Sequence, residues 1–157
     1  MAKKKDDGEK SVATNRKAYH DYFILERHEA GMALSGTEVK SLRDGRANLK
    51  DAYVIFKSGE AWLFGLHISP YSHGNLNNHE PERTRKLLLH RREIDKLAEE
   101  GTIKGNAVIP LRIYFKGSRA KVEVAVVKGK RQYDKRETER TKEADREAAS
   151  AMKHGHR

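Results

Sequence analysis

The 157-residue sequence contains no cysteine, and this absence excludes several kinds of chemistry at once. Without a thiol there is no disulfide, no thiolate ligand for a metal ion and no cysteine nucleophile. No run of residues approaches the ~20 apolar positions that a membrane-spanning helix needs. The first ten residues are highly charged, but no apolar segment follows them, so a secretory signal is not expected. The sequence therefore predicts a cytoplasmic protein that does not bind a membrane.

Motifs for catalysis and for metal binding are also missing. The chain has no G-x-S-x-G, no H-E-x-x-H and no P-loop. His67, His73 and His79 recur every six residues, a spacing that matches neither a helical pair nor a zinc motif. The carboxylates lie among Lys and Arg residues, which is typical of solvated ion pairs. We therefore expect a protein that is not an enzyme and needs no cofactor and no metal.

Acidic residues are scarce relative to basic ones, with 23 Asp and Glu against 33 Lys and Arg, a net charge of +10. Such an excess concerns partners rather than fold, and the polyanions available to it are nucleic acids and anionic lipids. No apolar helical face accompanies the charge of the C-terminal segment, which argues against lipid. Nucleic acid is the expected partner.

Large apolar residues are concentrated in the middle of the chain, which predicts three zones. Residues 1–18 are polar and are expected to form a flexible N-terminal arm. All Phe, Trp, Ile and Leu residues lie within residues 19–127, so only this part can build a core. Residues 128–157 carry 10 Lys and Arg against 6 Asp and Glu, a net +4. Alanines and spaced opposite charges favour a helix there, but such a helix is marginal alone, so this tail is expected to be disordered when free.

Alternating apolar residues in the middle zone predict short strands. Val122, Val124 and Val126 share one face of a strand, and Pro110 is expected at a sheet edge or a bulge. Gly101 is the expected C-terminal cap of a helix. Strands are expected at residues 22–25, 53–56, 61–64, 87–89, 108–115 and 121–127, and helices at 37–42 and 91–100. Residues 57–60 are expected to turn the chain, so that 53–56 and 61–64 form a hairpin. The pattern predicts a mainly β protein with short helices, arranged as a small antiparallel barrel.

Positive charge is clustered beside these expected elements. The clusters are Lys40 with Arg43, Arg83–Lys86, Arg91–Arg92 and Lys128–Arg131. The planar guanidinium of Arg suits phosphate groups, and structured RNA is recognised by backbone shape and by stacking of exposed bases. Tyr19, Tyr22 and Tyr71 are candidate stacking surfaces. The alternatives are solvated surface charge and a general RNA-binding or ribosomal structural protein.

Several motifs follow one another along the chain in a specific order. They are Asn15–Ala18, His20–Phe23, Glu29–Gly31, Gly36–Arg43, Gly45, Asn48–Leu49, Asp51–Tyr53, Pro81, Arg83, Arg85–Ile94 and Lys128–Arg136. Together they resemble the SsrA-binding protein family, also called small protein B. The resemblance extends over about residues 12–157 without large gaps.

The resemblance implies an oligonucleotide-binding (OB) type barrel with a basic C-terminal tail. Members of this family are non-enzymatic adaptors of trans-translation. They bind the tRNA-like domain of transfer-messenger RNA (tmRNA, or SsrA RNA) and deliver it to stalled ribosomes, where nascent-chain tagging and ribosome rescue follow. The tail would become helical at the decoding centre of the small subunit and in the mRNA path. Elongation factor Tu and alanyl-tRNA synthetase would be engaged indirectly through the RNA, and the protein is expected to be a monomer.

The resemblance also assigns tmRNA-binding positions. They are Glu29, Lys40, Arg43, Asn48, Leu88, His90 and Lys121. Glu29 would accept hydrogen bonds from base or ribose groups or orient basic neighbours, Leu88 would offer an apolar surface to a base, and Lys121 would contact phosphate. His90 stands where some members have Asn, and it can donate a hydrogen bond or cap the helix that follows.

A second set of positions in the tail matches the family's ribosome-contacting segment. It comprises Gly129, Lys130, Arg131, Tyr133, Asp134, Lys135, Arg136, Met152 and Lys153. Tyr133 replaces a His found in some members, and both side chains can stack on a base. Many members carry Trp and Ile where this chain has Ala144 and Glu139. The tail is therefore expected to dock mainly through charge, hydrogen bonding and Met152.

Overall fold

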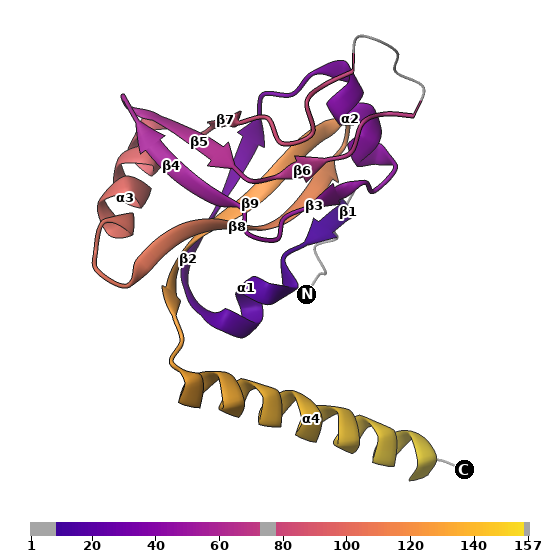
Figure 1. The fold of residues 1–157 in the computed structure, drawn as a ribbon. Helices are drawn as coiled ribbons and strands as arrows, with labels where there is room; N and C mark the ends of the chain where they lie inside the picture. Colours follow the sequence, from indigo (N-terminus) through magenta and orange to yellow (C-terminus); the bar gives the residue numbers. More distant parts are fainter. Residues whose placement is uncertain (1–8, 73–77, 156–157) are drawn as a thin grey trace.

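The computed structural model describes residues 9–72 and 78–155, with side chains described through residue 149 (Figure 1). This part of the chain holds nine strands and four helices. Their order is β1 (Glu9–Thr14), α1 (Arg16–Asp21), β2 (Tyr22–Met32), α2 (Gly36–Arg43), β3 (Ala47–Asn48), β4 (Tyr53–Lys57), β5 (Glu60–Phe64), β6 (His67–Ile68), β7 (Arg85–Leu88), α3 (Arg91–Gly101), β8 (Asn106–Lys116), β9 (Arg119–Gly129) and α4 (Gln132–Gly155). The prediction of a mainly β protein is confirmed, and each expected strand and helix overlaps an observed one.

Seven strands form one antiparallel sheet in the order β1-β8-β9-β2-β7-β5-β4. The short strands β3 and β6 form a separate pair. The edge strand β4 lies close to β8 without being paired with it, so the sheet curls around an interior (Figure 1). The predicted hairpin is confirmed, since Lys57 pairs with Glu60 across a turn whose residues Ser58 and Gly59 both have positive φ.

The main hydrophobic core fills this curl. Val122, Val124 and Val126 are buried there, as their alternation predicted. Helix α3 covers the core with Ile94 and Leu97. Burial of these side chains, at roughly 1.5–3 kcal/mol each, provides much of the driving force for folding.

A second apolar cluster lies on the outer face of β8 and β9, beneath α1. It is made of Ala18, Ile109, Leu111, Ala125 and Val127. The register of β8 shifts between Pro110 and Arg112, which confirms the bulge expected at the proline. Because of this extra residue, the inward-facing positions of β8 change parity along the strand, and the strand contributes to both clusters.

The expectation of a flexible arm over residues 1–18 is wrong from Glu9 onward. Strand β1 pairs with β8 from Glu9 to Thr14, and α1 begins at Arg16. Asn15 caps this helix, because its side chain accepts from the Ala18 N–H at 3.2 Å, and it is buried. Residues 1–8 lie outside the described part. Main-chain pairing with an available sheet edge has ordered a segment that has few apolar side chains.

Two local details also differ from the expectation. Gly101 is the last residue of α3, and the C-cap is Thr102, whose N–H bonds to the Glu99 carbonyl at 3.3 Å. In the segment 87–89, Leu87 is buried, but Leu88 is 53% exposed. Successive side chains of a strand point to opposite faces, so Leu87 enters the core and Leu88 faces solvent.

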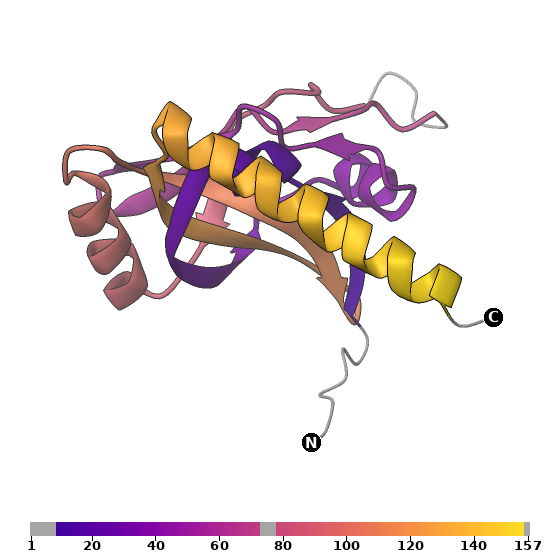
Figure 2. The ribbon, with the colours of Figure 1, turned by 90° about the horizontal axis from the view of Figure 1, so that it is seen from below.

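The tail forms a long helix, α4, that runs beneath the body from a point near α1 (Figures 1 and 2). The sequence predicts a tail that is disordered in the free protein, and the structure has a helix over Gln132–Gly155. Opposite charges support it, as between Glu137 and Arg140, 2.6 Å apart. His20 of α1 contacts Glu139 of α4 at 2.6 Å. These contacts supply anchoring that an isolated helix lacks.

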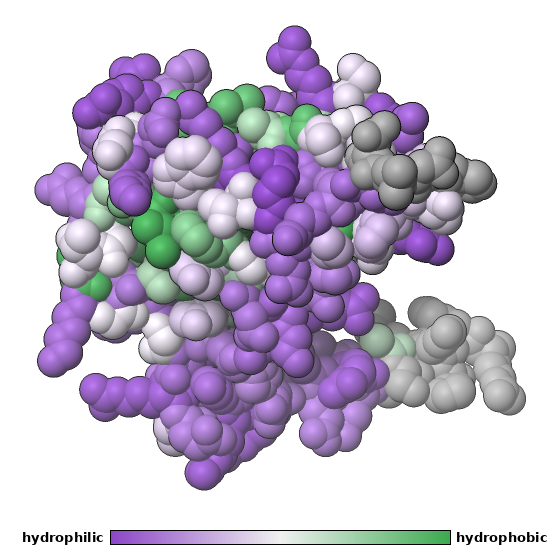
Figure 3. Space-filling model, turned by 45° about the horizontal axis from the view of Figure 1, so that its top comes forward, coloured by the Kyte–Doolittle hydropathy of each residue, from purple (hydrophilic) through white to green (hydrophobic). Residues whose placement is uncertain are grey.

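The surface is mostly hydrophilic, above all over α4 (Figure 3). Apolar residues gather instead on the side of the body where β4, β5 and α3 lie (Figures 1 and 3). No helix in the described residues is long and apolar enough to cross a membrane.

Candidate nucleic-acid interface

An open groove of about 730 Å³ lies where β2, β7, β9 and the start of α3 meet. Four residues expected to bind RNA line this groove together: Glu29, Leu88, His90 and Lys121. They come from β2, from β7, from the residue before α3 and from β9. Residues that are 92 positions apart in sequence therefore share one surface, because β2 lies between β9 and β7 in the sheet.

Gly31 of β2 lines the groove and pairs with residues on both neighbouring strands. In the sheet it pairs with Lys121 on one side and with Leu88 on the other. A β-carbon placed on Gly31 would lie 3.4 Å from the β-carbon of Leu88. The glycine therefore leaves room for Leu88 to lie over the β2 backbone, which gives the Glu29–Gly31 motif a physical reason.

Glu29 is held in its ionised form beside this surface. The Tyr114 hydroxyl donates a hydrogen bond to its carboxylate, and Lys116 Nζ donates another at 3.3 Å. The bond from Tyr114 and the neighbouring lysines hold the pKa of Glu29 below its ordinary value. An acceptor with a fixed orientation thus lies at the groove, and Glu29 also contacts the basic side chain of Lys116.

Leu88 and His90 form the apolar and the polar side of the groove next to α3. With 53% of its surface exposed, Leu88 is one of the large apolar residues that the fold leaves open to solvent. His90 occupies the N-cap of α3, and its N–H donates to the Glu93 carboxylate at 3.1 Å. His90 therefore stands at the start of α3, where its main chain takes part in the cap.

The other three expected residues do not reach this groove. Lys40 lies over the ring of Tyr71 at 5.6 Å, and Arg43 lies over the ring of Phe115 at 4.5 Å. Asn48 is on β3, where its side chain accepts from the Lys50 N–H at 2.8 Å. The seven residues therefore form two groups, one at the groove and one around α2 and β3.

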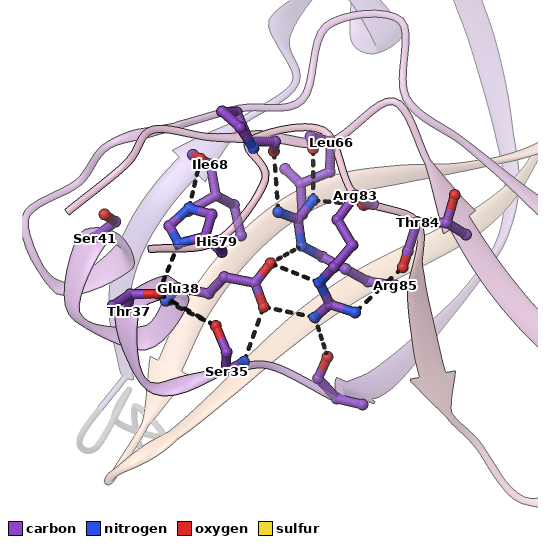
Figure 4. Close-up of polar contacts among 12 residues, drawn as sticks. Ser35, Thr37, Glu38, Ser41, Leu66, Ile68, His79, Arg83, Thr84 and Arg85 are labelled. Atoms are coloured by element: carbon purple, nitrogen blue, oxygen red, sulfur yellow. Dashed lines mark hydrogen bonds and ion pairs between the residues drawn. The ribbon is translucent and has the colours of Figure 1, made fainter. Parts of the chain in front are cut away.

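A buried ionic cluster fixes α2 to the body (Figure 4). Glu38 accepts from Arg85 Nε at 2.7 Å and from Arg83 Nη2 at 2.6 Å, and both Glu38 and Arg85 are fully buried. Burial favours the neutral carboxyl, but the bonds from Arg83, the Ser35 N–H and Arg85 outweigh it and lower the pKa of Glu38. Arg85 also donates to the carbonyl oxygens of Leu66, Pro81 and Arg83.

One basic residue expected to be available to RNA is part of this cluster. The prediction is wrong for Arg85, whose side chain is fully buried and paired with Glu38. Its neighbour Lys86 does line the groove, 2.8 Å from Glu60. The sequence contained the signal, because Arg85 has the inward parity of Leu87 and Lys86 has the outward parity of Leu88.

Gly59, Glu60 and Glu93 also line the groove, and no sequence pattern predicted this. Gly59 belongs to the hairpin turn, and the Arg91 guanidinium lies against it, 3.1 Å from where a β-carbon would be. The hairpin itself was predicted, but its position beside α3 depends on long-range pairing of β5 with β7.

The expected stacking surfaces and histidines have partners within the protein. Arg27 lies over the ring of Tyr19 at 5.9 Å, and Tyr22 packs against the second apolar cluster. His67 contacts Glu82 at 3.3 Å, and His79 contacts Thr37 at 2.9 Å. His73 lies outside the described residues, among which no cluster of three or more potential metal ligands occurs.

The beginning of the tail is attached to α1. Lys130 Nζ donates to Thr138 at 2.6 Å and lies over the ring of Phe23 at 5.2 Å, while Lys135 is 3.7 Å from Asp21. Gly129 ends β9 and Asp134 accepts from the Arg131 N–H. Arg131, Tyr133 and Arg136 are exposed. Met152 and Lys153 belong to α4, but their side chains are outside the described part.

Comparisons with known proteins identify similar chains. Residues 12–154 match the family model described as SmpB protein. An SsrA-binding protein of Geobacter sulfurreducens is 55% identical over 146 residues, covering 93% of this chain and 95% of that protein. One of Koribacter versatilis is 57% identical over 145 residues, covering 92% and 83%.

A solved structure described as "tmRNA-SmpB: a journey to the center of the bacterial ribosome" contains a similar chain. Its TM-score to this structure is 0.67, with 45% sequence identity, and the match covers 81% of this chain and 93% of that chain. The family match spans the curled sheet, the groove and most of the tail. On these grounds the chain belongs to the SmpB protein family.

Proposed function

We propose that this protein is a non-enzymatic adaptor of trans-translation that binds the tRNA-like domain of tmRNA in the groove. The convergence of Glu29, Leu88, His90 and Lys121 on one surface carries the proposal. Lys121 supplies positive charge for phosphate, Glu29 an oriented acceptor and Leu88 an apolar surface for a base. The names of the relatives support the choice of RNA, since the similar proteins are called SsrA-binding proteins.

The second group of residues would extend the RNA footprint. Lys40 and Arg43 lie on α2 and Asn48 on β3, beside the groove-forming body rather than in the groove. In this proposal they contact the backbone of the same RNA at a second place, outside the groove. The curled sheet, with α3 over its core, would then serve as an OB-type barrel.

The tail would act on the ribosome. In this proposal the protein delivers tmRNA to stalled ribosomes, where residues 129–136 together with Met152 and Lys153 contact small-subunit rRNA at the decoding centre and along the mRNA path. Nascent-chain tagging and ribosome rescue follow. Elongation factor Tu and alanyl-tRNA synthetase associate through the RNA, the protein works as a cytoplasmic monomer, and the similarity to a chain from a tmRNA-SmpB ribosome structure supports the ribosomal role.

A gel shift against tmRNA, with bulk tRNA as competitor, tests the RNA-binding step. Leu88→Ala should weaken binding roughly fivefold, because covering its half-exposed side chain contributes about 1 kcal/mol. Leu25→Ala is the matched control, since Leu25 is 54% exposed but does not line the groove, and it should leave binding unchanged. Equal affinity of the unaltered protein for tmRNA and bulk tRNA would instead favour a general RNA-binding protein.

Removal of the tail tests the second step. Strand β9 continues to Gly129, and the Lys130 N–H bonds to the Asp21 carbonyl at 2.8 Å, so the chain should be cut after Lys130. The shortened protein should bind tmRNA almost as well as the full chain and should fail to support tagging on stalled ribosomes. Loss of RNA binding as well would contradict a division of labour between body and tail.

A further inference from the structure

The β4–β5 hairpin exposes an apolar surface that the groove does not include. Tyr53 pairs with Phe64, and Ile55 pairs with Trp62, so these four side chains lie on the same face of the sheet. We call them the aromatic face. Tyr53 is 45% exposed and Ile55 is 41% exposed, while Trp62 and Phe64 are half-buried. The rings of Tyr53 and Phe64 are stacked, with centroids 5.5 Å apart.

The aromatic face adjoins the groove on one continuous sheet surface. Trp62 pairs directly with Lys86 of β7, which lines the groove, and Glu60 lies two residues before Trp62 on the same side of β5. Leu88 lies two residues after Lys86 on β7, so its side chain points to the same outward face of the sheet. A ligand that lies on Leu88 and continues along the sheet therefore meets Trp62 and then Ile55 and Tyr53.

The charge around this surface has a small positive excess. Lys57, Lys86 and Arg91 lie around the hairpin end nearest the groove, where Lys86 is 2.8 Å from Glu60 and Arg91 is 3.2 Å from Asp95. Two of the three positive charges are therefore balanced within the protein, and Lys57 supplies the excess. Apolar rings with a cation beside them match the two parts of a nucleotide, its base and its phosphate.

We propose that the aromatic face stacks one or more unpaired nucleobases of the RNA that the groove holds. The proposal rests on the proposed function, because the groove brings the RNA to this surface. It adds a binding surface for single-stranded nucleotides beside the groove, with Lys86 between the two. Tyr53 and Trp62 provide the stacking rings, and stacking against Phe64 fixes the orientation of the Tyr53 ring.

The chain offers an intrinsic probe, because Trp62 is its only tryptophan. Its fluorescence, followed while tmRNA is added to the full-length protein, should be quenched with the same midpoint as the gel shift. Acrylamide should quench Trp62 less effectively in the complex than in the free protein. Unchanged emission and unchanged acrylamide access, in a complex that the gel shift shows to be formed, would overturn the proposal.

Substitution of Tyr53 provides an independent readout. Tyr53→Ala should weaken tmRNA binding roughly tenfold, because removing an aromatic ring that stacks on a base typically has an effect of this size in proteins that bind single-stranded nucleic acid. Tyr53→Phe keeps the ring and should retain full affinity. Circular dichroism identifies any variant that fails to fold, and Phe64→Leu then replaces Tyr53→Ala as the variant expected to bind less tightly.

The two proposals fail in different ways. If Leu88→Ala weakens binding while Tyr53→Ala and Phe64→Leu do not, the groove binds RNA and the aromatic face does not. If the unaltered protein does not select tmRNA, the proposed function fails and the aromatic face proposal with it. Self-association of the free protein in sedimentation, abolished by Tyr53→Ala without any change in RNA affinity, would make this face a contact between two copies and would also refute the proposal.

Discussion

Replacing Glu38 with Gln tests how α2 is held in place. The substitution keeps the shape of the side chain but removes the only carboxylate that contacts Arg85 and Arg83 among the described residues. Arg83 is 40% exposed and can turn its charge toward water, whereas Arg85 is fully buried and cannot. The loss of folding stability therefore comes mainly from the guanidinium of Arg85, which stays buried without a compensating carboxylate.

Breaking a buried ion pair from one side costs about 3–5 kcal/mol. Arg85 keeps three carbonyl acceptors, so we expect the lower end, about 3 kcal/mol of unfolding free energy. For a chain of this size that loss lowers Tm by roughly 6–12 °C. Urea unfolding followed by circular dichroism and by the fluorescence of Trp62 measures it.

The matched control is Glu137→Gln. Glu137 forms an ion pair with Arg140 on the tail, with 46% and 67% of the two side chains exposed, and such a pair contributes less than ~0.5 kcal/mol. Because the pKa of Glu38 is lowered in the folded state, its stabilisation is present above the ordinary value of 4.5 and is lost as pH falls through the lower folded value. The difference in unfolding free energy between the unaltered protein and Glu38→Gln should therefore shrink in acid. A loss below about 1 kcal/mol at pH 7 would refute the reasoning.

Two further predictions concern other polar contacts. Tyr114→Phe removes the largest cause of the lowered pKa of Glu29, so that pKa should rise toward its ordinary value in an NMR titration, and an unchanged pKa would contradict the role given to Tyr114. Hydrogen bonds to Asp21 and then to Glu139 raise the pKa of His20. Attachment of α4 should therefore be strongest below pH 6.5 and weaken as pH rises through the raised value, with faster amide exchange in α4; Glu139→Gln should reduce this dependence.

Sequence patterns predicted the strands whose apolar residues alternate. Residues 53–64 and 121–127 carry that signal plainly, because one face enters the core and the other meets water. Strand β2 shows the limit of this approach, since only residues 22–25 were expected and the strand runs to Met32. The later part carries charged side chains such as Glu26 and Glu29, and it is ordered by pairing with β9 and β7, which a local pattern cannot reveal.

The candidate site shows the same division between local and long-range information. Resemblance to a family named Glu29, Leu88, His90 and Lys121, but nothing in their spacing indicated that they share a groove. Their convergence depends on strand order, with Gly31 pairing to both neighbours. Strand β1 went unrecognised for a similar reason, because its polar residues are ordered by the free edge of β8. Parity in β7, in contrast, was readable from sequence and separates Arg85 from Lys86.

Net charge overstates the electrostatic attraction that this protein offers to RNA. Glu38 neutralises one of the two positive charges of Arg83 and Arg85, and Lys135 faces Asp21 at the base of the tail. Cations paired in this way within the protein would release few counterions on binding RNA. The salt dependence of binding reflects only cations that meet phosphate. In the proposed function, surface cations such as Lys121 would therefore account for RNA binding to the body, and the selectivity would come from the shape and the apolar surfaces around them.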